Sequence, residues 1–245
     1  MIYEFIEALL SDAPKWARKQ NLVKESVAIG ARYKRQSKAW AEHLANCQNE
    51  IQEFVLKYKS AKRITILGSG HLLDVPAGLL ENKSYEFYLF DAVHPRSIRK
   101  TRYKAKCHFL VADLNLGAQE LKRQFHSEFS ACDLVISLNL LSQLALSGSQ
   151  HLQQKPNERA SYAKSLVENH ISLLESMARP YLLISDFEKH FIGLKGENIL
   201  SESSLWDHQL PKPKRIWPWN LAPNGEISKD YRLELQVGVW EKIGL

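Results

Sequence analysis

The sequence lacks the features that define several large classes of protein. Its cysteines, Cys47, Cys107 and Cys132, are far apart and odd in number, which fits neither a disulfide framework nor a zinc site. No apolar run reaches the roughly eighteen residues of a membrane span, and the apolar stretch 1–10 contains two glutamates, unlike a signal peptide. Low-complexity segments and repeats of fixed period are also absent. We therefore expect a soluble, cytoplasmic protein with reduced thiols and no metal site.

The composition is that of a globular protein with an excess of positive charge. The 245 residues are 44% hydrophobic, enough for one large core, and the formal net charge is +6. Basic residues crowd the region 15–38 and recur in 57–63 and 96–106. Such patches attract nucleic acid or anionic substrates, and a solvated basic surface is the alternative.

Residues 1–59 contain helical patterns and no strand signal. Between residues 24 and 58, apolar side chains recur every three or four positions, which predicts one long amphipathic helix or two with a kink near Gly30. We interpret 1–59 as an N-terminal helical extension and 60–245 as the main domain.

From residue 63 onward, short apolar strands alternate with helices. Strands are predicted at 63–67, 85–90, 107–112, 133–138 and 181–185, and helices at 72–80, 95–103, 118–125 and 159–177. Continuously apolar strands, each followed by a helix, favour a parallel sheet covered on both faces. Residues 231–240 alternate and predict an antiparallel edge strand, which 214–217 can pair. We expect an α/β, Rossmann-like, mostly parallel seven-stranded sheet with an antiparallel edge strand.

Polar residues or glycine close each predicted parallel strand, and ligands of such sheets bind outside these strand ends. The residues concerned are Gly68, Asp91, Asp113, Asn139 and Asp186. The glycines of the Gly68-Ser69-Gly70 loop allow a ligand to approach the backbone closely, and the helix expected from residue 72 would add its N–H groups. An acid about twenty residues later is placed to accept both hydroxyls of a ribose. The pattern indicates a nucleoside cofactor.

This arrangement, over residues 63–186, resembles the class I S-adenosylmethionine-dependent methyltransferases. The resemblance implies that the glycine loop holds the methionine part of S-adenosylmethionine and that the acid after the second strand binds ribose. It implies that the acid after the third strand contacts adenine and that the loop after the fourth strand lies beside the transferable methyl group. The terminal hairpin resembles that family's reversed final strand. The implied cofactor-binding residues are Gly68, Ser69, Gly70, Asp91, Ala92, Asp113, Leu114 and Asn139.

Two positions depart from that family's pattern. Ile66 stands where an acid commonly helps to hold the cofactor's ammonium group, and Leu72 stands where a third glycine is usual. Asp74 is an alternative source of the carboxylate.

These departures motivate a second hypothesis, a non-catalytic binding or scaffold protein of the same fold. A third is RNA binding through the basic N-terminal helices. A dinucleotide cofactor ranks below S-adenosylmethionine, because its GxGxxG pattern needs glycine where Leu73 stands.

The expected activity is methyl transfer to an unidentified small molecule, protein or RNA. Positioning supplies much of the rate of such a reaction, and a base is needed only when the acceptor must first lose a proton. The candidates for a catalytic role are His71, His94 and Asn139, with His151 as a further candidate base. For each histidine, the alternative is a surface or capping role.

Overall fold

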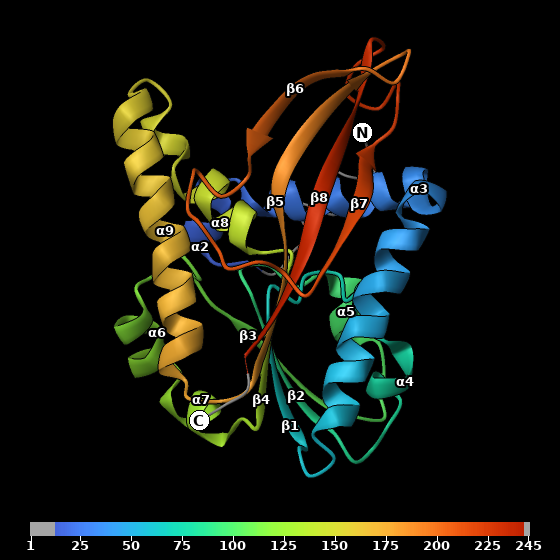
Figure 1. Cartoon of the computed structure of the whole chain (residues 1–245). Coiled ribbons are helices and arrows are strands. Elements are labelled where there is room, and N and C mark those ends of the chain that lie inside the picture. Colours follow the sequence, from blue (N-terminus) through green and yellow to red (C-terminus); the bar gives the residue numbers. More distant parts are fainter. Residues whose placement is uncertain (1–12, 243–245) are drawn as a thin grey trace.

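The computed structural model describes residues 13–242 and, within them, an α/β fold built on one eight-stranded sheet. The strand order is β3-β2-β1-β4-β5-β8-β7, and β6 pairs with β5 outside this path. Figure 1 shows helices on both faces, with α4, α5 and much of α3 on one side and α6, α7 and α9 on the other. The expected Rossmann-like class is confirmed. In the described part of the chain, no helix has the length and apolar character needed to cross a membrane.

The strands and helices have the following bounds. The strands are β1 (Arg63–Leu67), β2 (Glu86–Asp91), β3 (Lys106–Val111), β4 (Leu134–Leu138), β5 (Tyr181–Gly193), β6 (Asn198–Ser203), β7 (Arg215–Ala222) and β8 (Tyr231–Lys242). The helices are α2 (Lys15–Lys19), α3 (Leu22–Lys57), α4 (Ala77–Leu80), α5 (Arg96–Lys100), α6 (Ala118–Gln124), α7 (His126–Ala131), α8 (Leu141–Gly148), the 3-10 turn η1 (Gln150–Leu152) and α9 (Pro156–Ser176).

Strands β1 to β5 pair in parallel, and the strand order reverses between β1 and β4. β4 is buried along its whole length and β1 at every residue after Arg63, as their continuously apolar sequences require. β1 has β2 on one side and β4 on the other, so the crevice at their carboxyl ends is the topological switch point where ligands of such sheets bind.

Strand β5 continues beyond the end that the sequence suggested. Asp186 was expected to close this strand, but a bulge between Asp186 and Glu188 lets it run on to Gly193. Its second half pairs with β6, and its whole length pairs with β8; both pairings are antiparallel. The expected antiparallel strand is therefore present as β8, with β7 outside it. The additional strand, β6, is exposed at every residue and so carries no burial pattern that predicts it.

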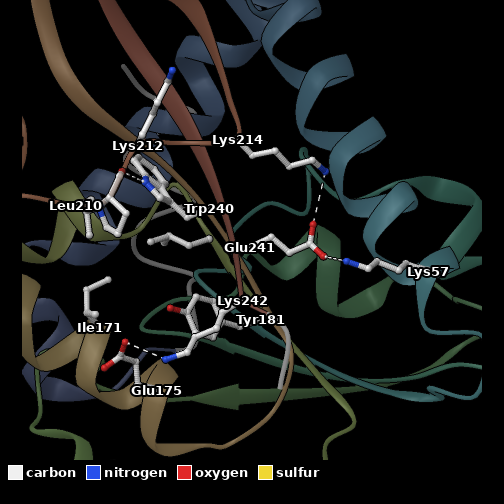
Figure 2. A pocket seen from close by; sticks show the side chains of 12 residues that line it. Lys57, Ile171, Glu175, Tyr181, Leu210, Lys212, Lys214, Trp240, Glu241 and Lys242 are labelled. Atoms are coloured by element: carbon white, nitrogen blue, oxygen red, sulfur yellow. Dashed lines mark hydrogen bonds and ion pairs between the residues drawn. The ribbon is translucent and has the colours of Figure 1, made fainter. Parts of the chain in front are cut away.

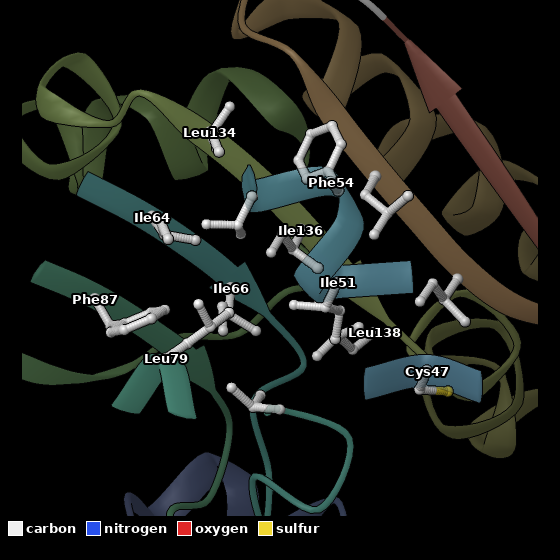
Figure 3. Packing of buried hydrophobic residues seen from close by; sticks show 14 of the residues in the cluster. Cys47, Ile51, Phe54, Ile64, Ile66, Leu79, Phe87, Leu134, Ile136 and Leu138 are labelled. Carbon is white, nitrogen blue, oxygen red and sulfur yellow. The ribbon is translucent and has the colours of Figure 1, made fainter. Parts of the chain in front are cut away.

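Helix α3 has two parts that play different roles. The kink lies at Gln36, whose backbone angles (φ −115°, ψ 22°) are not helical, and not near Gly30 as expected. The second part packs Cys47, Ile51 and Phe54 into the same core as the sheet, as Figure 3 shows. The first part runs in another direction, across the upper part of the sheet (Figure 1). At the kink, Glu226 of the β7–β8 turn accepts hydrogen bonds from Arg35 (2.6 Å) and Gln36 (2.9 Å).

The helix expected directly after the glycine loop is much shorter than predicted. Residues 68–76 form a loop, and α4 begins only at Ala77. Leu72 turns the chain with a φ of +56°, and Pro76 disfavours helical geometry at Val75. The helix amino terminus expected at residue 72 is therefore absent from the glycine loop, and that part of the sequence-based prediction was wrong.

Candidate functional site

The glycine loop is joined to the end of β2 by backbone and side-chain hydrogen bonds. The N–H groups of Gly68 and Ser69 both donate to the carbonyl oxygen of Phe90, at 2.9 and 3.1 Å. The Asp91 carboxylate accepts from the N–H of Gly70 (2.8 Å) and from that of Val93 (3.2 Å). The half-buried Asp91 thus fixes both loops on this side of the switch point.

The two glycines have different structural reasons to be glycine. At Gly68 (φ +80°) a Cβ atom would stand 2.8 Å from the carbonyl oxygen of Leu138 and 3.0 Å from Cβ of Leu140. At Gly70 (φ +39°) the nearest atom to a Cβ would be Oδ2 of Asp91, at 3.7 Å. Gly68 therefore lets the ends of β1 and β4 approach each other, whereas a Cβ at Gly70 would meet only Asp91, at an ordinary van der Waals distance.

On the other side of the switch point, Asn139 ends β4 in a left-handed conformation with φ +45°, which asparagine tolerates better than most residues. Its Nδ2 donates to Oδ1 of Asp74 at 3.2 Å and lies 3.3 Å from Nε2 of His43. Its Oδ1 is buried and has no hydrogen-bonding partner among the described residues. Asn139 therefore brings Asp74, from the loop after β1, to the end of β4.

His43 of α3 is held in one tautomer by the indole of Trp217. The indole Nε1 lies 3.1 Å from Nδ1 of His43, and the ring of Trp219 stacks on the imidazole at 3.8 Å. Because an indole N–H only donates, Nδ1 must accept and the proton of a neutral imidazole sits on Nε2. Nε2 lies 3.5 Å from Oδ1 of Asp74. Trp217 therefore turns the N–H side of the imidazole toward Asp74 and Asn139.

His43, Cys47 and Asp74 also form a group that could hold a metal ion, with ligand atoms within 4.8 Å of one another. A metal would need a lone pair on Nε2 of His43 and a thiolate at Cys47. Trp217 leaves the imidazole proton on Nε2. Burial, followed by the charge of Asp74, raises the pKa of the Cys47 thiol well above its usual value. Because Trp217 donates to Nδ1, Nε2 of His43 has no free lone pair for a metal ion, and this geometry favours a hydrogen-bond network.

Sequence reasoning missed this network because its members come from four elements. Trp217 is 174 positions from His43 along the chain, and no local pattern connects them. The one available signal was the pairing of His43 with Cys47 one helical turn later, on the buried face of α3.

The first part of α3 and the short helix α2 cover both loops of the site. Nε2 of His71 donates to the carbonyl oxygen of Ser26 at 2.8 Å, and the His71 ring lies against Gly30, where a Cβ would stand 2.6 Å from Cε1. Trp16 of α2 packs in one apolar cluster with Ala92 and Val93, directly after Asp91. His71 is thus bonded to α3, and Ala92 lies beneath α2.

The other predicted residues lie around the same edge with mainly structural contacts. His94 is 2% exposed and its Nε2 donates to the Leu110 carbonyl at 3.2 Å; burial lowers its pKa, opposed by the charge of Asp91. The Asp113 carboxylate accepts the N–H of Asn115 at 3.1 Å, and Leu114 is buried in the core. His151 lies in η1.

Asp186 is buried behind the switch point. Its Oδ1 accepts a hydrogen bond of 2.6 Å from the hydroxyl of Ser142, on α8. Burial raises the pKa of this carboxyl group, and the hydrogen bond from Ser142 opposes the shift. The contacts identify Asp186 as an anchor between β5 and α8.

A separate cavity of about 600 Å³ lies where β5 begins and β8 ends (Figure 2). Apolar side chains, among them Leu183 and Trp240, and a set of lysines line it. Glu241 pairs with Lys57 and Lys214, and Glu175 pairs with Lys242 at 3.2 Å. Three of the four lysines that line the cavity therefore pair with an acidic side chain. The cavity lies at the opposite end of the parallel strands from the site described above.

The site thus has two carboxylates at one strand edge, Asp91 on the β2 side and Asp74 on the β4 side; the glycine loop precedes Asp74 in the sequence and is bonded to Asp91. Comparison of the sequence with protein-family models gives no match, and comparison with curated proteins gives none either.

Proposed function

We propose that the protein binds S-adenosylmethionine at the switch point and transfers its methyl group to an acceptor that is still to be identified. The observation that carries the proposal is the bond between Asp91 and the glycine loop. A carboxylate at the end of β2 lies beside the backbone of Gly70, and it is the one neighbour, at 3.7 Å, that a Cβ atom on this glycine would meet within 4 Å. A ribose needs such a carboxylate, and a chain that must pass close to the backbone needs such a glycine.

The residues present fit the parts of this cofactor. Asp91 would hold the ribose, the amino-acid chain would pass along the backbone of residues 68–70, and Asp113 with Ala92 would face the adenine, whereas Leu114 is buried in the core. When bound, the cofactor supplies a methyl group whose bond to sulfur breaks as the acceptor forms its new bond, and the sulfur keeps the electron pair. The chain's own part is to align the reactants and to exclude water. Helix α2 and the first part of α3 cover both loops of the site, and this cover would help to exclude water.

The departures at Ile66 and Leu72 do not fill the proposed site. The Leu72 side chain is buried in the hydrophobic core that α3 forms with the sheet. The His71 ring is hydrogen-bonded to the Ser26 carbonyl of α3. Both placements favour a binding-competent loop over the scaffold hypothesis. Ile66 is fully buried within β1, so this position supplies no charge to the site.

The contacts of the N-terminal helices give no separate support for RNA binding. Arg32 and Arg35 both lie against Glu226, at 3.5 and 2.6 Å. These side chains hold the β7–β8 turn to the kink of α3, and part of the basic charge of the extension is neutralised there.

Isothermal titration calorimetry with S-adenosylmethionine and S-adenosylhomocysteine tests the proposal. We expect binding of both ligands, in a one-to-one ratio. No heat with either ligand at millimolar concentration would contradict cofactor binding. Binding without transfer of a radiolabelled methyl group to any fraction of a cell extract would favour the scaffold hypothesis.

A further inference from the structure

We infer that Asp74 binds the ammonium group of the cofactor's amino-acid part, and that His43 and Trp217 position its carboxylate. The inference rests on the proposed function and concerns the half of the site at the end of β4. It assigns roles to residues of α3 and β7, elements that lie far from the glycine loop in sequence.

The first step concerns charge. The amino-acid end of S-adenosylmethionine carries an ammonium group, and a cation taken out of water needs an anionic partner. β1 supplies none, because Ile66 is fully buried. Asp74 lies on the same loop as Gly68 and Gly70, and its side chain is 22% exposed, so its carboxylate still reaches solvent.

The second step concerns position. Oδ1 of Asp74 accepts the hydrogen bond from Nδ2 of Asn139, the residue that follows β4. Asp74 therefore stands at the β4 side of the switch point, across from Asp91, which is bound to Gly70. A ligand whose ribose lies at Asp91 and whose chain follows the glycine loop ends at Asp74.

The third step concerns the hold on the carboxylate. His43 and Trp217 are 1% and 7% exposed, so neither side chain has room to turn away. Because Trp217 fixes the tautomer of His43, the proton on Nε2 faces Oδ1 of Asp74 at 3.5 Å. Asn139 donates a hydrogen bond to Oδ1 of Asp74, and Nε2 of His43 packs 3.5 Å from the same oxygen atom. Both groups turn an N–H toward the carboxylate without adding a full positive charge that would repel the ammonium group.

The experiment compares two ligands that differ in the amino-acid part. S-adenosylhomocysteine carries the ammonium group, and 5′-methylthioadenosine lacks it but keeps the nucleoside. We expect Asp74→Asn to weaken S-adenosylhomocysteine about 10- to 100-fold, the worth of one charge-assisted contact, and to leave 5′-methylthioadenosine within about twofold. Trp217→Phe should weaken S-adenosylhomocysteine about threefold and again spare the shorter ligand.

The controls separate the inference from the proposed function. Asp133→Asn changes a carboxylate that binds the N–H groups of Lys62 and Arg63 near the opposite end of β1, so both affinities should stay as in the wild type. If the wild type binds neither ligand, the proposed function fails. If both ligands bind and Asp74→Asn weakens both equally or neither, the assignment of Asp74 is wrong.

Two further outcomes keep the inference open to contradiction. If Asp74→Asn does not fold, as judged by circular dichroism, Trp217→Phe carries the same comparison of ligands. If micromolar Zn²⁺ raises the melting temperature of the wild type but not of Asp74→Asn, the cluster is a metal site and the inference is overturned.

Discussion

The two carboxylates of the site are held in different ways. Asp91 is fixed by backbone N–H groups, one two residues away and one 21 residues away. Asp74 is fixed by side chains, and the chain of donors behind it reaches across 174 positions to Trp217. The first arrangement follows from one strand-loop-strand unit, whereas the second exists only after α3 and β7 have packed together. The half of the site proposed for the nucleoside is therefore formed by residues close together in the sequence. The half proposed for the amino-acid part is assembled from elements that are far apart in the sequence.

The largest expected effect comes from Asp91→Ala. Loss of the carboxylate removes the proposed bonds to two ribose hydroxyls, each worth about 1.5–3 kcal/mol, so affinity for S-adenosylhomocysteine and for 5′-methylthioadenosine should both fall at least 100-fold. Asp133→Ala is the matched control, because it also removes a carboxylate that binds two backbone N–H groups. Titration calorimetry measures both variants. Equal losses in the two variants would mean that the loss at Asp91 reflects damage to the fold.

The next effect separates the two glycines of the loop. Gly68→Ala adds a Cβ at 2.8 Å from the Leu138 carbonyl in a left-handed position, and should lower the free energy of unfolding by about 2–4 kcal/mol. Gly70→Ala meets only Asp91 at 3.7 Å and should cost about 1 kcal/mol, from the backbone conformation alone. Urea denaturation measures both. A larger cost at Gly70 than at Gly68 would contradict the room that a Cβ has beside Asp91.

The same distinction explains how far the sequence predicts this molecule. The parallel strands and the joining of Gly68, Gly70 and Asp91 at one edge follow from short apolar runs and the residues that end them. The helix after residue 72 was overpredicted, because the left-handed turn at Leu72 depends on burial of its side chain. The sequence could not predict the bond from Trp217 to His43, since no periodicity relates a tryptophan on an outer strand to a histidine on α3.

A buried histidine stands close to Asp91, and its protonation gives a third test. The pKa of His94 is lowered chiefly by burial, so below about pH 6.5 the unfolded chain takes up a proton that the folded chain does not. Stability therefore falls as the pH falls from about 6.5 toward the folded pKa. His94→Gln should flatten this dependence between pH 7 and 5, measured by urea denaturation. His170 is buried and burial lowers its pKa to about 4, so it contributes separately to the pH dependence of stability. His170→Gln should remove that contribution. An unchanged slope in His94→Gln would contradict the buried, neutral ring.

The smallest effect is expected at Cys47. It decides whether Asp74 is held by hydrogen-bond donors or by a metal ion. The thiol is fully buried, lies 3.6 Å from Nε2 of His43, and is near enough to Asp74 for that carboxylate to raise its pKa beyond the effect of burial, but a thiol is only a weak donor. Cys47→Ala should cost about 1 kcal/mol through lost packing and leave the affinity for S-adenosylhomocysteine within about twofold. A metal centre would lose one of its three ligands in the same variant, and ligand affinity and stability would then fall together. Calorimetry and urea denaturation of this variant therefore distinguish a carboxylate held by neutral donors from one held by an ion.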